Sequence, residues 1–176
     1  VTEIPENAKK LIDAFWPAPL TIVMKKSGII PEIVTAGLDT VGIRIPQNET
    51  AIKLLSECGV PVAAPSANTS GKPSPTSARH VAEDLFGKID AIVDGGRCSI
   101  GLESTVIDVS GETPLLLRPG GITYEQLTDV LGVVVQSFNL NEGETPKSPG
   151  VKYTHYSPKA KVVVIKGDFI KYIYEN

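Results

Sequence analysis

The spacing of apolar residues along the chain predicts helices and strands that alternate. Apolar positions recur at helical spacing in four segments: Glu6–Phe15, Glu49–Glu57, Thr76–Phe86 and Thr123–Leu131. Short apolar or alternating runs predict seven strands: Leu20–Met24, Val41–Ile45, Val60–Ala64, Ala91–Val93, Thr105–Val109, Leu115–Arg118 and Val133–Val135. This interleaving predicts an α/β domain.

Residues with turn and cap chemistry mark several of the element ends. The helix that begins at Glu49 is expected to end at Gly59, and Thr76 or Ser77 is expected to cap the following helix. The turn Ser110-Gly111-Glu112 predicts a β-hairpin between its two flanking strands.

The pattern changes at Asn139, where apolar periodicity fades and Pro, Gly, Ser, Thr and Lys take over. We therefore expect a first domain over residues 1–138, a basic linker over residues 139–160, and the first strand of a C-terminal α/β domain over residues 161–176. The stretch Thr145–Lys161 holds four lysines, two tyrosines, one histidine and no acidic residue. It fits either a solvated tether or a flap that covers an anionic ligand.

Composition narrows the class of protein. Hydrophobic residues make up 41% of the chain and charged residues 21%, as in soluble globular proteins. A net charge of −3 argues against a chain coated by nucleic acid, although it allows a local basic patch. No apolar run approaches the roughly 18 residues of a membrane span. The first residues lack the apolar core of a signal peptide. Two cysteines without metal-site spacing fit a reduced, cytoplasmic protein.

One loop is richer in candidate chemistry than the rest of the chain. Residues Pro65–Arg79 contain six hydroxyl residues, three prolines and two cations, Lys72 and Arg79, and no acid. Hydroxyls, backbone N–H groups and positive charge together suit an anion such as phosphate. A turn-rich connector would favour many of the same residues, so both interpretations stay open.

Two arginines occupy positions where a charge needs a partner. Arg44 is expected at the centre of a strand, where it either faces solvent or pairs with a carboxylate or phosphate. Arg118 ends an apolar strand before a forced turn, a suitable place for an anionic ligand or an ordinary strand exit. Ser104 and Thr105 enter a strand with their hydroxyls on opposite faces. A serine hydrolase is disfavoured because the G-x-S-x-G motif is absent.

Taken together and in order, these segments resemble one enzyme family. The segments WPAPLTIVMKKS, TVGIRIP, PSANTSGKPSPT, GLESTVIDVS, LLLRPGGI and SPGVKYTHYSPKAK are similar to those of the YrdC-like threonylcarbamoyl-AMP synthases. The resemblance runs from Val1 to about Lys161, and the segment after it looks like the C-terminal domain of the longer members. It implies a twisted mixed sheet with outer helices and a concave basic cavity. It also implies a cytoplasmic enzyme that joins L-threonine, bicarbonate and ATP and releases pyrophosphate, with Mg²⁺ bridging the phosphates.

The resemblance also implies roles for individual residues. Arg44, Arg118 and Ser104 would serve catalysis. ATP would contact a set of hydroxyls, one cation and a linker aromatic: Thr40, Ser66, Ser74, Arg118 and Tyr156, with Tyr153 and His155 as substitutes for Tyr156. Threonine would be held by Arg44, Ser104 and the backbone at Ala64. Thr21 is expected near the bicarbonate or threonine, and Asn68 and Lys72 are further candidates in the loop.

The chain departs from the family pattern in its first part. The early threonine, the Lys-x-Arg motif and a further strand and helix set have no counterpart in Val1–Asn176. We therefore expect a piece cut at both ends, with weak or no synthase activity alone. Two rival functions stay open: a module that binds double-stranded RNA or tRNA, and a regulatory nucleotide-binding module without catalysis.

Overall fold

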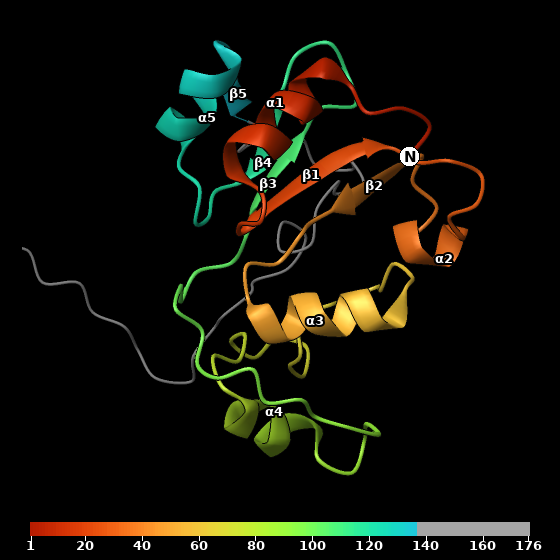
Figure 1. Cartoon of the computed structure of the whole chain (residues 1–176), viewed down its shortest axis with the longest axis vertical. Coiled ribbons are helices and arrows are strands. Elements are labelled where there is room, and N and C mark those ends of the chain that lie inside the picture. The colour runs from red at the N-terminus through yellow and green to blue at the C-terminus, as the bar shows by residue number, and fades with distance from the viewer. Residues whose placement is uncertain (137–176) are drawn as a thin grey trace, which may run out of the picture.

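The protein is built around a five-stranded mixed sheet with the strand order β2-β1-β3-β4-β5. A computed structural model describes residues 1–136, and everything below refers to these residues. The strands are β1 (Leu20–Lys25), β2 (Thr40–Ile43), β3 (Thr105–Asp108), β4 (Leu115–Arg118) and β5 (Val135–Gln136). The helices are α1 (Glu6–Phe15), α2 (Glu32–Thr35), α3 (Glu49–Cys58), α4 (Ala78–Leu85) and α5 (Tyr124–Leu131). Figure 1 shows α1 and α5 beside the sheet and α3 and α4 beyond its end. The predicted mixed α/β architecture is confirmed.

Parallel and antiparallel pairings alternate across the sheet. β1 lies between β2, which is antiparallel to it, and β3, which is parallel to it. β3 and β4 form the predicted antiparallel hairpin, with a register irregularity between Val106 and Ile107. β5 extends the sheet beside β4 in parallel.

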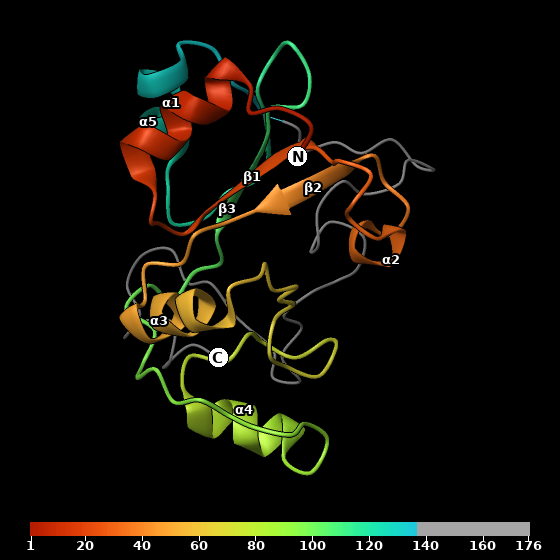
Figure 2. The same cartoon turned by 45° about the vertical axis from the view of Figure 1, so that its right-hand side comes forward.

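The core lies on one face of this sheet. Leu20, Ile22 and Met24 point from β1 into a buried cluster with Ile107 and Leu116. Leu11 of α1 and Leu127 of α5 complete the cluster, and both are fully buried. Figure 2 shows these two helices together on the same side of the strands. Strand side chains alternate between faces, so the residues between the core positions point away from α1 and α5.

Local cap signals were read correctly from the sequence. Gly59 ends α3 in the left-handed conformation at φ 64°, which glycine adopts at low cost. The Ser77 side chain accepts a hydrogen bond from the His80 N–H at the start of α4. Thr123 and Gln126 form a reciprocal capping box at the start of α5. These three helices occupy the positions expected, within a few residues at each end.

Two predicted strands are wrong. Residues Val60–Ala64 and Ala91–Val93 carry no strand structure, and Val60, Val62 and Val93 have 62%, 53% and 61% of their surface exposed. Their β-branched composition favours extended backbone, but a strand also needs a neighbour for its N–H and C=O groups. None of the five described strands lies beside either segment. The short helix α2, which begins after Pro31, was not predicted.

The predicted position of Arg44 at a strand centre is also wrong. β2 ends at Ile43, so Arg44 is the first residue after the strand. Pro19 and Pro46 near this end have no N–H to donate, and one further hydrogen bond, from the Ala18 N–H to the Ile45 carbonyl at 3.2 Å, joins the two segments. Arg44 therefore lies at the end of the sheet, where a ligand can approach.

Candidate functional site

Polar residues gather on the sheet face opposite the core. The registers pair Gly42 with Val23, Thr21 with Val106, and Val106 with Arg118, which places these positions on one face. Thr40 and Arg44 share the parity of Gly42, and Ser104 shares that of Val106. Thr105 points the other way, and its hydroxyl donates to the Ile122 carbonyl at 2.6 Å. The prediction that Ser104 and Thr105 face opposite sides is confirmed.

Arg118 is held at this face by the residues that precede β3. Its Nε and Nη2 donate to the Ser104 carbonyl oxygen at 3.1 and 2.9 Å, and Nη2 also donates to Ser104 Oγ at 3.1 Å. Ser104 Oγ is in turn hydrogen-bonded to Thr21 Oγ1 at 2.9 Å. Three residues predicted for catalysis or substrate binding are thus in direct contact.

Glu103 connects this group to the hydroxyl-rich loop. Its Oε2 lies 2.6 Å from Arg118 Nη1, and its Oε1 accepts a hydrogen bond from Ser74 Oγ at 3.2 Å. The ion pair is mostly shielded, since the two side chains are 20% and 29% exposed. Ser74 and Arg118, both predicted for ATP, therefore lie on either side of one carboxylate.

The site carries two positive charges near each other. Burial lowers the pKa of Arg118 below its ordinary value, Glu103 opposes this shift, and the positive charge of Arg44 adds to it. No ion pair or hydrogen bond involves the Arg44 side chain within residues 1–136. Two neighbouring guanidinium groups repel each other, so an anion between them would be favoured.

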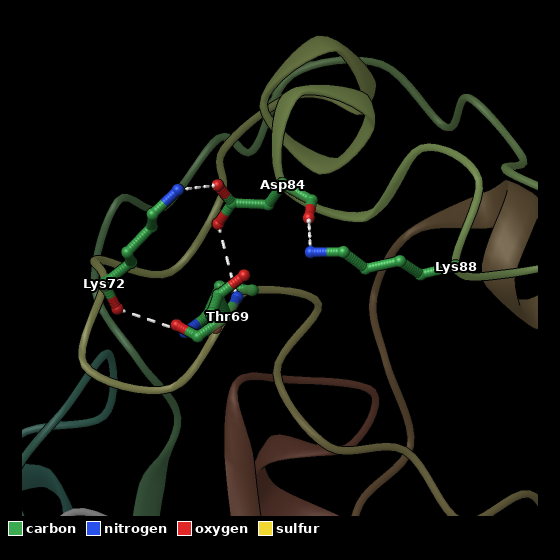
Figure 3. Close-up of polar contacts among 5 residues, drawn as sticks. Thr69, Lys72, Asp84 and Lys88 are labelled. Carbon is green, nitrogen blue, oxygen red and sulfur yellow. Dashed lines mark hydrogen bonds and ion pairs between the residues drawn. The ribbon is translucent and has the colours of Figure 1, made fainter.

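The hydroxyl-rich loop is tied to α4 by an acidic residue (Figure 3). The Asp84 carboxylate forms an ion pair with Lys72 and accepts the Thr69 N–H at 3.3 Å, while Lys88 Nζ donates to the Asp84 carbonyl at 3.1 Å. Asn68 Nδ2 donates to the carbonyl oxygens of Thr69 and Lys72. Asn68 and Lys72, both site candidates, thus hold the loop in shape. A pocket of about 280 Å³ lies between Lys72–Thr76 and α4.

The Lys72–Asp84 pair leads to a testable pH dependence. The hydrogen bond from Lys72 is the largest cause that lowers the pKa of Asp84 below its ordinary 3.8. A lowered pKa means that the contact stabilises the fold above pH 3.8 and is lost as the pH falls below it. An NMR titration of the Thr69 amide should therefore show a midpoint below 3.8, and Lys72→Ala should raise that midpoint. A midpoint that Lys72→Ala leaves unchanged would contradict the assignment.

Other predicted residues stand apart from the network. Ala64 and Ser66 lie in the exposed connection between α3 and α4, and no hydrogen bond joins either to Arg118 or Glu103 in the described part of the chain. Thr40 is buried at the start of β2, paired with Lys25 rather than beside Arg118. Tyr156, Tyr153, His155, the linker and the C-terminal strand lie outside the described residues.

Sequence reasoning missed the two acids, Glu103 and Asp84, as parts of the site. The loop that contains Lys72 has no acid of its own, and Asp84 on the following helix supplies one. Glu103 directly precedes Ser104, so a charge beside a candidate hydroxyl was the available signal.

Residues 1–136 contain neither a cluster of metal-ligating side chains nor a membrane-spanning helix. No group of three or more His, Cys, Asp and Glu side chains is placed to hold a metal ion there. In the same residues, no helix has both the length and the apolar character needed to span a membrane.

Comparison with known proteins matches the chain to one family. The Sua5, YciO and YrdC family model, described as telomere recombination, matches residues 1–120. A second model, described as the C-terminal domain of threonylcarbamoyl-AMP synthase, matches residues 122–172.

Individual relatives agree with the family match. The threonylcarbamoyl-AMP synthases of Pyrococcus abyssi and Bacillus subtilis are each 52% identical, over 94% and 93% of this chain. The alignments cover 49% and 48% of those proteins, so the chain spans about half their length. The crystal structure of P. abyssi Sua5 complexed with L-threonine is 50% identical, with a TM-score of 0.89 over 98% of this chain and 52% of that one. E. coli YciO is 26% identical, with a TM-score of 0.59 over 67% of this chain and 58% of its own. The chain therefore belongs to the Sua5, YciO and YrdC family.

Proposed function

We propose that this chain carries the ATP and threonine sites of a threonylcarbamoyl-AMP synthase. The observation that supports this most is the polar face of the sheet, where Arg44, Arg118, Ser104 and Thr21 converge. The relatives that carry this activity by name are 52% identical, and one is known with L-threonine bound. The enzyme would be a nucleotidyltransferase whose product serves threonylcarbamoyladenosine formation in tRNA.

The reaction would join three substrates without a covalent enzyme intermediate. Threonine and bicarbonate give an N-carboxylated threonine: the amine forms a C–N bond with the bicarbonate carbon, a C–O bond breaks and water leaves. A carboxylate oxygen of this product attacks the α-phosphorus of ATP. A new P–O bond forms, the α–β phosphoanhydride bond breaks, and pyrophosphate leaves. Both partners are anions, so negative charge gathers at the α-phosphate, and fixed cations and hydroxyl donors lower the barrier.

The residues divide between the two substrates in this proposal. Arg118 and Ser74, which meet at Glu103, would contact ATP together with Thr40, Ser66 and Tyr156. Arg44, Ser104 and the Ala64 backbone would hold threonine, and Thr21 would orient Ser104 through their hydrogen bond. The described residues offer no acidic cluster for a metal, so Mg²⁺ would arrive bound to the phosphates of ATP.

A pyrophosphate-release assay tests the proposed activity. Release should require ATP, L-threonine and bicarbonate together, and calorimetry should detect ATP and threonine binding even where turnover by this chain is weak. An RNA affinity that falls steeply with salt and ignores ATP would favour an RNA-binding module instead. ATP binding without any pyrophosphate release from the full-length protein would favour a regulatory module.

Arg44→Ala should weaken threonine binding and leave the fold intact. A lost charged hydrogen bond corresponds to roughly 1.5–3 kcal/mol of binding free energy. The free energy of unfolding should change by less than about 0.5 kcal/mol, because Arg44 is exposed and its side chain makes no hydrogen bond or ion pair within residues 1–136. Calorimetry with L-threonine and thermal denaturation measure the two effects.

Arg79→Ala is a matched control for the loss of charge. Arg79 is also exposed, and among residues 1–136 its one ion pair is with Glu83 on its own helix, at 2.8 Å. Its removal should leave threonine affinity unchanged. Equal losses of threonine affinity in the two variants would show that the loss reflects the overall charge of the protein rather than a contact of Arg44 with threonine.

A further inference from the structure

Glu103, the residue before Ser104, contacts two of the proposed ATP residues, Arg118 and Ser74. Its two carboxylate oxygens are divided between Arg118 Nη1 and Ser74 Oγ, at 2.6 and 3.2 Å. These groups come from different parts of the fold, the end of β4 and the loop before α4. A carboxylate therefore stands at the point where a strand cation and a loop hydroxyl meet.

The geometry of Arg118 limits how a phosphate could reach it. The Nε and Nη2 side of the guanidinium is directed at the Ser104 carbonyl and hydroxyl. The Nη1 side is directed at Glu103. A phosphate oxygen that approaches Nη1 meets the carboxylate already bound there, and two anions on one donor repel each other.

Electrostatics around the pair favours an exchange of anions. Arg44 adds positive charge close to Arg118, so an anion bound at Arg118 is attracted by a second guanidinium group as well. A triphosphate carries several negative charges and could satisfy both guanidinium groups and the Ser74 hydroxyl together. The Glu103 side chain is 29% exposed, so a displaced carboxylate regains part of its hydration, and the contacts of the phosphate with the cations offset the remaining cost.

We propose that Glu103 is a built-in competitor for the nucleotide phosphates. In the unliganded protein its carboxylate occupies the phosphate position between Arg118 and Ser74, and binding of a triphosphate displaces it. The contact offsets one of the two positive charges of the site, holds Arg118 in place and sets a threshold for nucleotide binding. This inference rests on the proposed function only in identifying the anion as that of ATP.

Binding of inorganic tripolyphosphate to Glu103→Gln tests the competition directly. Glutamine keeps the shape and a hydrogen-bond acceptor but removes the charge, so tripolyphosphate should bind about five- to twentyfold more tightly than to the unaltered chain. ATP should show a gain of similar size. Unchanged or weaker tripolyphosphate binding would overturn the proposal, since a residue that only positions Arg118 would cost affinity when altered.

Two further variants control for a general effect of charge and for unfolding of Glu103→Gln. Glu6→Gln removes the same charge from an exposed pair with Lys9 at 3.6 Å on α1, and it should leave tripolyphosphate affinity unchanged. An equal gain in Glu6→Gln would overturn the proposal. If Glu103→Gln unfolds, Glu103→Asp retains the charge with a shorter reach and should bind tripolyphosphate about twofold more tightly. Unchanged or weaker binding by Glu103→Asp would then overturn it.

The two proposals fail separately in this design. Tighter tripolyphosphate binding by Glu103→Gln, together with no threonine-dependent pyrophosphate release from the full-length protein, would support the competitor and refute the synthase. Pyrophosphate release by the full-length protein without tighter tripolyphosphate binding by Glu103→Gln would support the synthase and refute the competitor.

Discussion

Replacing Gly120 with alanine is expected to destabilise the protein by more than about 3 kcal/mol. A Cβ at this position would lie 2.3 Å from the Glu103 carbonyl oxygen, 2.4 Å from the Thr105 nitrogen and 2.6 Å from the Ser104 carbonyl carbon. All three atoms belong to the backbone, so no side chain can rotate to make room. The strand entry that carries Glu103 and Ser104 would have to shift, and the network around Arg118 would shift with it. Chemical denaturation of the variant measures the loss.

Gly111→Ala is the matched control for this change. Gly111 lies in the turn between β3 and β4, and a Cβ there would meet nothing within 4 Å. The free energy of unfolding should change by less than about 0.5 kcal/mol. If Gly120→Ala is equally harmless, the close approach of the Gly120 backbone to residues 103–105 is not a constraint on the fold.

Gly120 also explains why the site forms where it does. Arg118 ends β4, and the chain can turn back over residues 103–105 only because position 120 has no side chain. Gly121 N–H then donates to the Glu103 carbonyl at 3.3 Å. The LRPGG sequence thus brings the guanidinium to the backbone that it binds.

The sequence predicts well those elements that local chemistry determines. The cap at Ser77, the end of α3 at Gly59 and the β3–β4 hairpin depend on neighbouring residues, and all three were expected. The segments Val60–Ala64 and Ala91–Val93 fail because strand structure depends on a distant partner. Apolar composition alone cannot supply that information.

The same distinction applies to the candidate site. Arg118 and Ser104 could be nominated as residue types at strand ends and Thr21 from the family resemblance, and the three residues do meet. The sequence did not indicate which acids pair with these cations, because Asp84 is 12 residues from Lys72 and Glu103 precedes a different strand from the one that Arg118 ends. Which carboxylate pairs with which cation is a property of the fold.

Arg118→Ala should produce the largest loss of nucleotide binding. ATP affinity is expected to fall by roughly 1.5–3 kcal/mol, the scale of a lost charged hydrogen bond. The fold should also lose roughly 2–4 kcal/mol, because the largely shielded Glu103 carboxylate and the Ser104 carbonyl lose their partner. Calorimetry with ATP and chemical denaturation measure the two losses independently.

A double variant separates binding from stability. In Arg118→Ala with Glu103→Gln, no unpaired carboxylate remains at this position, so much of the lost stability should return. ATP affinity should nevertheless stay well below that of Glu103→Gln alone, because the cation is still missing. If ATP affinity returned together with stability, Arg118 would support the fold without contacting the nucleotide. If Arg118 binds phosphate, the loss of ATP affinity and the loss of stability must be separable. The ion pair with Glu103 stabilises the fold, whereas the phosphate needs only the Arg118 cation.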